Sequence, residues 1–326
     1  MELFSSISKK SKLLIITAFS IVIALAVIGC SSGTQTESPG DNTNSTEKLS
    51  GTIKIDGSST VLPISEAVAE EFMRENQGVN VTVGSSGTGG GFKKFVSPNN
   101  PIDVNDASRP IKDTEQEAAR QNGIEYIEIP VAYDGISIIV NKENTWAKSI
   151  TTEELKKIWE PGSKIKTWKE VRPDWPDTKL SLFGPSSAHG TFDYFTETIN
   201  GKEKAIRTDY NVSEEYNTVV QGVAADKGSL GFLGYAYYKQ NEGKLNVLGV
   251  DGGSGSIEPS EETIKDGSYK PLARPIFIYV SKKALDRLEV KEFVRFYLTE
   301  GPSLISDVGY IPLNDADYEG SLNAIK

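Results

Sequence analysis

From residue 51 onward, short apolar segments alternate with amphipathic ones, and this order limits the fold more than any other feature. The segment GTIKI (51–55) has the alternating pattern of a strand, and Ile64, Val68 and Phe72 then recur at four-residue spacing, as on one face of a helix. Further strand candidates, VNVTVGSS and PIDVNDASRPI, are separated by helix candidates in the same way. The order predicts an α/β fold with a largely parallel sheet.

Two long extended segments interrupt this alternation, at residues 124–142 and 269–281. The first is longer than one average strand, and we expect Asp134-Gly135 to interrupt it. We interpret it as a strand that leaves one lobe and enters another, and the second as a segment that crosses back. The length of 326 residues is compatible with two lobes.

The net charge of −10 restricts the partners of the chain. It argues against a nucleic-acid binder, because Lys and Arg hold the phosphate backbone of nucleic acids. It gives no help in attracting a small anion either, so an anion site here must depend on local dipoles and hydrogen bonds.

The first 29 residues have the pattern of a secretory signal peptide. Three lysines precede an apolar run at 13–28, which is short for a membrane span and is not followed by stop-transfer charges. The run ends in VIGC, which looks like a bacterial lipobox, so we expect cleavage before Cys30 and lipidation of its thiol, with palmitate as an acyl group. A free thiol after a plain signal is the alternative. Cys30 is the only cysteine, which leaves no disulfide within the mature chain.

Residues 30–50 are rich in Ser, Thr, Asn, Gly and Pro and nearly free of apolar side chains. Such a segment cannot bury enough surface to offset its ordering entropy, so we expect a flexible tether. The folded body should begin near Gly51.

Four loops that follow strand candidates share one composition: DGSST (56–60), GSSGTGGG (84–91), NDASRP (105–110) and SSAHGT (186–191). Small residues, hydroxyls and backbone N–H groups near helix N-termini can hold a compact oxyanion, and Arg109 can add a charge-assisted pair of hydrogen bonds. The alternative is that they form turns and caps, with Ser59 or Thr60 capping the first helix. Four such loops at strand ends favour a site, because ligands of open α/β sheets bind there.

Other motifs fail. The glycine-rich loop has neither the spacing of a P-loop nor that of a dinucleotide fingerprint, and no G-x-S-x-G elbow occurs. One histidine and one cysteine cannot form a Cys/His zinc cluster. A Ser-His-Asp triad is compatible with the composition, but no local spacing supports it. We therefore expect no catalytic residue, no metal and no cofactor.

Seven segments resemble, in order, those of the phosphate-binding proteins of phosphate-specific ABC transporters: IDGSSTVLPISEAVAEEF, GSSGTGGGFKKF, DASRPIK, PVAYDGISIIVN, LFGPSSAHGTFDYF, GSLGFLGYAYY and ARPIFIYVS. The resemblance covers most of residues 51–326. It implies a two-lobed periplasmic-binding-protein fold of type II, with two hinge-crossing strands and phosphate buried between the lobes. Lobe I would comprise 51–133 and 275–326, and lobe II 134–274.

The resemblance also implies which residues contact phosphate. Matched position by position, they are Ser59, Thr60 and the Val61 amide, Ser86, Gly87 and Thr88, Ser108 and Arg109, and His189, Gly190 and Thr191. In some members an aspartate stands where Arg109 stands here and accepts the proton of hydrogen phosphate. Asp106 is nearby, and the acceptor that separates phosphate from sulfate stays open.

The fourth loop departs from the family pattern twice. His189, the only histidine, stands where a serine donor is usual; it can still donate to the anion, or it can cap the helix or point to solvent. Some members also carry an arginine shortly before this loop, and none occurs between Lys179 and Thr191.

The function that the resemblance implies is not enzymatic. It is a monomeric, lipid-anchored solute receptor on the extracytoplasmic face of the cell membrane, which captures inorganic phosphate and delivers it to an ABC permease. Two alternatives stay open: a binding protein for another tetrahedral oxyanion, and a secreted phosphate-ester hydrolase that uses a serine or His189.

Overall fold

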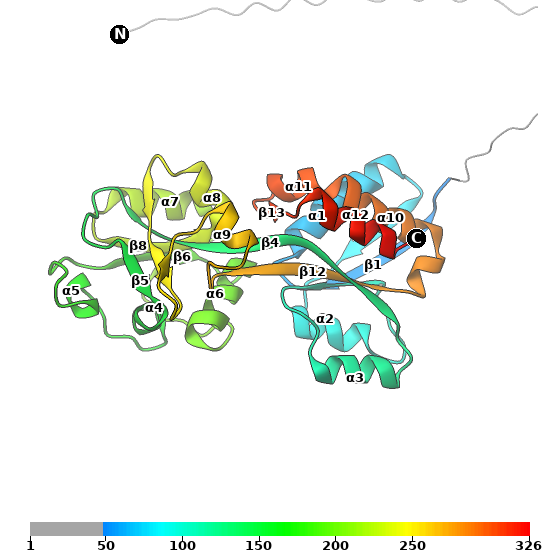
Figure 1. Cartoon of the computed structure of the whole chain (residues 1–326), viewed down its shortest axis with the longest axis horizontal. Helices are drawn as coiled ribbons and strands as arrows, with labels where there is room; N and C mark the ends of the chain where they lie inside the picture. Colours follow the sequence, from blue (N-terminus) through cyan, green and yellow to red (C-terminus); the bar gives the residue numbers. More distant parts are fainter. Residues whose placement is uncertain (1–47) are drawn as a thin grey trace, which may run out of the picture. The chain divides into compact units, whose positions relative to one another are not determined.

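The computed structural model describes residues 48–326, so the signal peptide, Cys30 and most of the tether predicted above lie outside the described residues. Figure 1 shows two groups of elements joined by two long strands. We call the groups lobe I and lobe II and define each by its elements. No helix within 48–326 has both the length and the apolar character needed to cross a membrane.

Lobe I is built on three parallel strands. Their order is β2-β1-β3, and their bounds are β1 (Gly51–Gly57), β2 (Val79–Val83) and β3 (Val104–Ala107). The helices that follow them are α1 (Leu62–Glu75), α2 (Thr88–Phe95) and α3 (Asp113–Gln121). The C-terminal part of the chain returns to this lobe with η1 (Ala284–Asp286), α10 (Leu288–Thr299), α11 (Gly301–Asp307), β13 (Ile311–Pro312) and α12 (Asp315–Ala324) (Figure 1). One core joins both parts, since Ile53 and Val68 are buried in the same cluster as Phe293.

Lobe II repeats the plan with a parallel core, β8-β6-β7, where β6 is Ser181–Pro185, β7 is Asn211–Ser213 and β8 is Ser229–Gly234. Strand β9 (Leu245–Val247) pairs antiparallel with the end of β4 (Tyr126–Asn141). A separate sheet holds β5 (Ser149–Thr151), β10 (Gly249–Asp251) and β11 (Ser256–Ile257). The helices are α4 (Thr152–Trp159), α5 (Trp168–Val171), α6 (Gly190–Asn200), α7 (Tyr216–Ala225), α8 (Tyr235–Gln240) and α9 (Glu261–Lys265). In its core, Phe195 stacks on Phe232 at 3.9 Å between ring centroids.

The lobes are joined by β4 (Tyr126–Asn141) and β12 (Ala273–Ser281), which run antiparallel to each other (Figure 1). Strand β4 pairs with β12 up to Gly135 and with β8 from Ile136 onward. The α/β prediction and the interpretation of both long segments as crossing strands are confirmed. The expected interruption at Asp134-Gly135 is wrong, because β4 continues through it. The glycine serves packing instead: a Cβ there would lie 2.5 Å from Cδ1 of Ile264.

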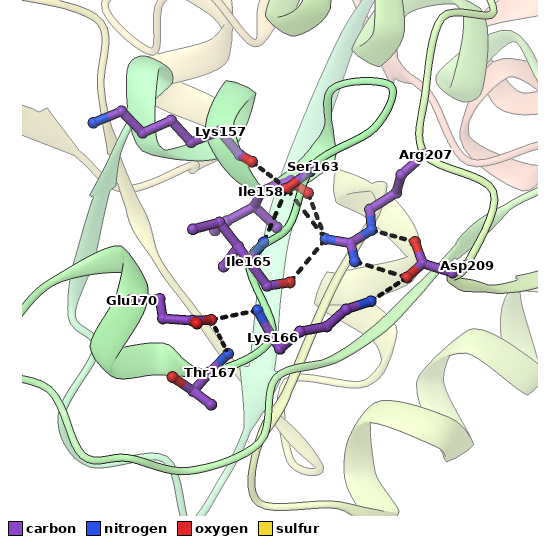
Figure 2. Close-up of polar contacts among 9 residues, drawn as sticks. All are labelled: Lys157, Ile158, Ser163, Ile165, Lys166, Thr167, Glu170, Arg207 and Asp209. Carbon is purple, nitrogen blue, oxygen red and sulfur yellow. Dashed lines mark hydrogen bonds and ion pairs between the residues drawn. The ribbon is translucent and has the colours of Figure 1, made fainter.

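A buried arginine ties together the loops of lobe II. Arg207 donates through Nη1 to the carbonyl oxygens of Ile158 (2.9 Å) and Ile165 (3.1 Å), and through Nε and Nη2 to both carboxylate oxygens of Asp209 (2.6 and 2.9 Å). Lys166 pairs with the same carboxylate (Figure 2). The charge of Arg207 is therefore neutralised by its own lobe, and its role is structural.

Lobe I contains a buried carboxyl group, that of Asp106, next to the first loop. Asp106, which is fully buried, accepts a hydrogen bond from Ser65 Oγ (3.0 Å), and that hydroxyl lies 3.1 Å from the hydroxyl of Tyr297. Burial raises the pKa of Asp106 from 3.8 to about 8, although the Ser65 hydrogen bond opposes the shift. Asp106 therefore faces the core of lobe I.

The raised pKa makes stability depend on pH. Between about pH 4 and 8 the folded chain keeps a proton on Asp106 that the unfolded chain releases, so the free energy of unfolding should fall as the pH rises through this window. Asp106→Asn should flatten this fall, and Asp177→Asn, at an exposed loop position, should leave it unchanged. Urea denaturation at several pH values measures the effect. Parallel curves for wild type and Asp106→Asn would contradict it.

Candidate anion-binding site

The first three loops lie side by side because their strands are neighbours in one parallel sheet. Gly57 pairs with Asp106 across β1 and β3, and the Ser58 N–H donates to the Asp106 carbonyl oxygen at 3.0 Å. Helix α2 packs directly on this edge, since a Cβ on Gly91 would lie 2.7 Å from the Cα of Gly57. Thr88 then meets Ser108: their hydroxyl oxygens are 3.0 Å apart.

The fourth loop comes from lobe II and meets the first loop of lobe I. A Cβ on Gly190 would lie 2.3 Å from the Cα of Thr60, so only glycine permits this approach. One residue earlier in the first loop, Ser59 Oγ donates to Asp193 on α6 at 3.0 Å. The described structure therefore has the lobes in contact at the N-termini of α1 and α6.

The hydroxyl groups of these loops are not used as helix caps. The N-cap residues of α1, α2 and α6 are Val61, Gly87 and His189, and none of these helices has a side-chain cap. The expectation that Ser59 or Thr60 caps the first helix is wrong, because their hydroxyls face Asp193 and Arg274 instead. In α1 the Leu62 N–H already donates to the carbonyl oxygen of Ser58 at 3.0 Å, and Pro63 has no N–H. The helix N-termini that bring N–H donors to these loops are therefore those of α2 and α6.

The predicted contact residues fall into groups with different surroundings. Thr60, Thr88 and Thr191 are buried, with 2%, 8% and 5% of their surface exposed. The Val61 N–H donates to the carbonyl oxygen of Ser58, three residues earlier, with 3.2 Å between nitrogen and oxygen. The structure brings the first and fourth loops together, and the second and third; whether each residue contacts an anion stays a prediction.

Ser86 is held by its own lobe. Its N–H donates to Asp56 Oδ1 at 3.0 Å, its hydroxyl donates to the same oxygen at 2.5 Å, and Lys94 donates to Asp56 Oδ2. Burial acts to raise the pKa of Asp56, but these bonds and the charge of Lys94 outweigh it, and the pKa lies below its usual value. An ionised Asp56 therefore fixes the second loop.

Arg109 has a carboxylate partner of its own. Its two terminal nitrogens each donate to a carboxylate oxygen of Glu115 at 2.9 Å, and its guanidinium lies over the ring of Phe92. Burial acts to raise the pKa of Glu115, but the bonds from Arg109 and Lys112 outweigh it, and the pKa lies below its usual value. The expected pair of bonds to an anion stays a prediction, and an anion would have to compete with Glu115.

His189 begins α6 and turns its ring toward α7. Its Nε2 lies 2.7 Å from the carbonyl oxygen of Glu214, and its ring centroid lies 4.6 Å from that of Tyr216. Because a carbonyl oxygen only accepts, Nε2 carries the hydrogen in this arrangement. Tyr216 in turn donates to Thr191 Oγ1 at 2.8 Å. His189 therefore supports the position of α7 and of the fourth loop.

A cavity of about 350 Å³ opens where the first and fourth loops meet. Ser59 and Pro63 line it from lobe I, Gly190 and Thr191 line it from lobe II, and Asp134 lines it from the crossing strand β4. Among the described residues, no group of three or more His, Cys, Asp or Glu side chains could hold a metal ion. The arrangement can bind a small anion through hydroxyl and N–H donors.

Sequence reasoning missed two charged residues at this place, Asp134 and Arg274. Arg274 on β12 donates through Nη2 to Thr60 Oγ1 at 3.2 Å, and it stands opposite Asp134 in the pairing of the crossing strands. The signal was present: each is a charge within a long, mostly apolar extended segment, where a charge needs a partner or a function.

Gly190 offers a test of the contact between loops. Gly190→Ala should push the first and fourth loops apart, because the added methyl group would overlap the backbone of Thr60. We expect a larger radius of gyration in small-angle scattering and a loss of about 1–3 kcal/mol in the free energy of unfolding. The matched control is Gly243→Ala, where an added Cβ meets no atom within 4 Å. Identical scattering and stability for the two variants would contradict the contact.

Comparison with known proteins agrees with this geometry. Residues 42–300 match the family model of a PBP superfamily domain. Protein SphX of Synechococcus elongatus is 49% identical over 264 residues, which are 80% of this chain and 77% of that protein. The phosphate-binding protein PstS of Staphylococcus saprophyticus is 41% identical over 83% of each chain.

A solved structure gives the same result. The crystal structure of a possible phosphate-binding protein from Planctomyces limnophilus is 48% identical, covers 85% of this chain and 98% of its own, and superposes with a TM-score of 0.81. It confirms the predicted two-lobed fold. Family model, relatives and structure lead to one conclusion: this chain belongs to the periplasmic-binding-protein (PBP) superfamily and, within it, to the family of SphX and PstS.

Proposed function

We propose that this protein is an extracytoplasmic receptor that binds inorganic phosphate between its two lobes and delivers it to an ABC permease. The observation that carries the proposal is the contact of Thr60 with Gly190, which joins the N-termini of α1 and α6 across the lobes. Relatives named phosphate-binding protein PstS support phosphate as the ligand. The protein would act by binding and not by catalysis.

In this proposal the anion is held by donors and not by the overall field, since the chain carries a net charge of −10. The first helical turns of α2 and α6 would supply N–H groups, and Thr60, Thr88 and Thr191 would supply buried hydroxyls. Ser108 lies beside Thr88, and Ser59 lies at the cavity. Ser86, Arg109 and His189 would need to leave present partners in order to contact the anion directly.

The two lobes would close around the ligand, with residues 51–133 and 275–326 forming one and 134–274 forming the other. Separate cores on the two sides of Gly135 support this division, since Ala132 is buried in one and Ile136 in the other. The permease would then distinguish the closed, loaded receptor from the open one. We propose a monomer, because one chain contributes both sides of the cavity.

Calorimetry on residues 31–326 tests the ligand. Phosphate should bind with one site per chain and sulfate should bind more weakly, and incubation with p-nitrophenyl phosphate should release no p-nitrophenol. Equal or tighter binding of sulfate would favour a receptor for another tetrahedral oxyanion. Turnover of the ester would favour the hydrolase and contradict the proposed function.

We further propose that the receptor is a lipoprotein, cleaved before Cys30 and anchored through its lipidated thiol, with residues 31–50 as a tether. Cys30→Ser in the full chain should release the protein from washed membranes, while phosphate binding stays unchanged. Western blotting of membrane and soluble fractions measures the release. Full retention of the variant on membranes would contradict the anchor and favour residues 13–28 as an uncleaved span.

A further inference from the structure

An oxyanion enclosed between two lobes needs a compensating positive charge, because burial of an unpaired charge is costly. Three arginines have less than a third of the side chain exposed and already pair with a carboxylate at hydrogen-bond distance. They are Arg109 with Glu115, Arg172 with Glu154, and Arg207 with Asp209. Figure 2 shows how completely the last of these is surrounded by acceptors of lobe II. Each of these charges is used within its own lobe.

Arg274 differs from them in position and in pairing. Only 15% of its side chain is exposed, and its closest carboxylate atom, Asp134 Oδ2, lies 3.7 Å from Nη2, beyond hydrogen-bond distance. Its Nε has no hydrogen-bond partner among the described residues. Nη2 contacts Thr60 of the first loop, and the guanidinium carbon lies 3.5 Å from the ring centroid of Tyr194 on α6. Arg274 thus contacts both lobes and keeps an unused donor.

Asp134 is the complementary group. It is 3% exposed and lines the same cavity as Ser59, Gly190 and Thr191. Its Oδ2 is buried and lacks a hydrogen-bond donor within the described part of the chain, which is unusual for a carboxylate oxygen. Burial raises the pKa of Asp134, and the charge of Arg274 offsets this only in part. A ligand hydroxyl would supply the missing donor.

We infer that Arg274 and Asp134 form the charged part of the anion site: Arg274 donates to the oxyanion, and Asp134 accepts a hydrogen bond from its protonated oxygen. The inference rests on the proposed function and assigns the charge and the acceptor within that site. Phosphate near neutral pH carries a hydroxyl, whereas sulfate carries none, so Asp134 would repel sulfate and accept from phosphate. The pair stands on the crossing strands, so both lobes close onto it.

The charge is tested by calorimetry with inorganic phosphate on wild type, Arg274→Gln, Arg274→Lys and the control Arg172→Gln. Arg274→Gln should weaken phosphate binding by about tenfold or more, since charge-assisted bonds are roughly twice as strong as neutral ones. Arg274→Lys should recover part of the loss. Arg172→Gln should leave phosphate affinity unchanged, because that guanidinium is paired with Glu154 and does not line the cavity. Thermal melts show that each variant is folded.

Unchanged affinity in Arg274→Gln, or an equal loss in Arg172→Gln, would overturn the assignment of the charge. If Arg274→Gln does not fold, the lysine variant decides: affinity below that of wild type but measurable supports the assignment, and wild-type affinity overturns it. A wild-type protein that binds no phosphate would instead overturn the proposed function, so the two failures are distinguishable.

The acceptor is tested by the ratio of phosphate affinity to sulfate affinity in Asp134→Asn, measured by competition with each anion. The amide keeps the shape of the carboxylate but can donate to sulfate, so we expect the preference for phosphate to shrink by about tenfold or more. If Asp134 had a purely structural role, the substitution would lower the affinity for phosphate and the affinity for sulfate by the same factor. An unchanged ratio would therefore overturn the assignment of the acceptor.

Discussion

The antiparallel pairing of β4 with β12 is the constraint on which the rest of the molecule depends. Each lobe is a parallel α/β unit with its own core, and these two strands carry the chain from one to the other. Gly135 marks the place where β4 exchanges β12 for β8 as its partner. The strand ends of both lobes thereby face each other, so loops far apart in sequence meet.

The meeting of those loops explains their composition. Glycine at 190 lets the backbone of lobe II reach the backbone of Thr60, and the small side chains around it leave helix N-termini free of side-chain caps. Helix α4, by contrast, begins with the predicted capping box of Thr151 and Glu154.

Periodicity and motif order in the sequence predicted the α/β class, the crossing segments and the four loops. They could not predict which polar groups of those loops pair with each other. Glu115 neutralises Arg109 only because α3 turns back over the third loop, and Asp106 faces Tyr297 only because the C-terminal helices return to lobe I. Arg274 was missed for the same reason: its partner Thr60 is 214 residues away in sequence. Long-range pairing decides which charges are left for a ligand.

A crystal structure of residues 31–326 with phosphate tests the central claim most directly. The account predicts phosphate between the N-termini of α1, α2 and α6, with oxygens within hydrogen-bond distance of Thr60, Thr191 and Arg274, and with Arg109 still on Glu115. Phosphate bound outside the contact of the two lobes, or held by Arg109 with Arg274 turned away, would contradict it.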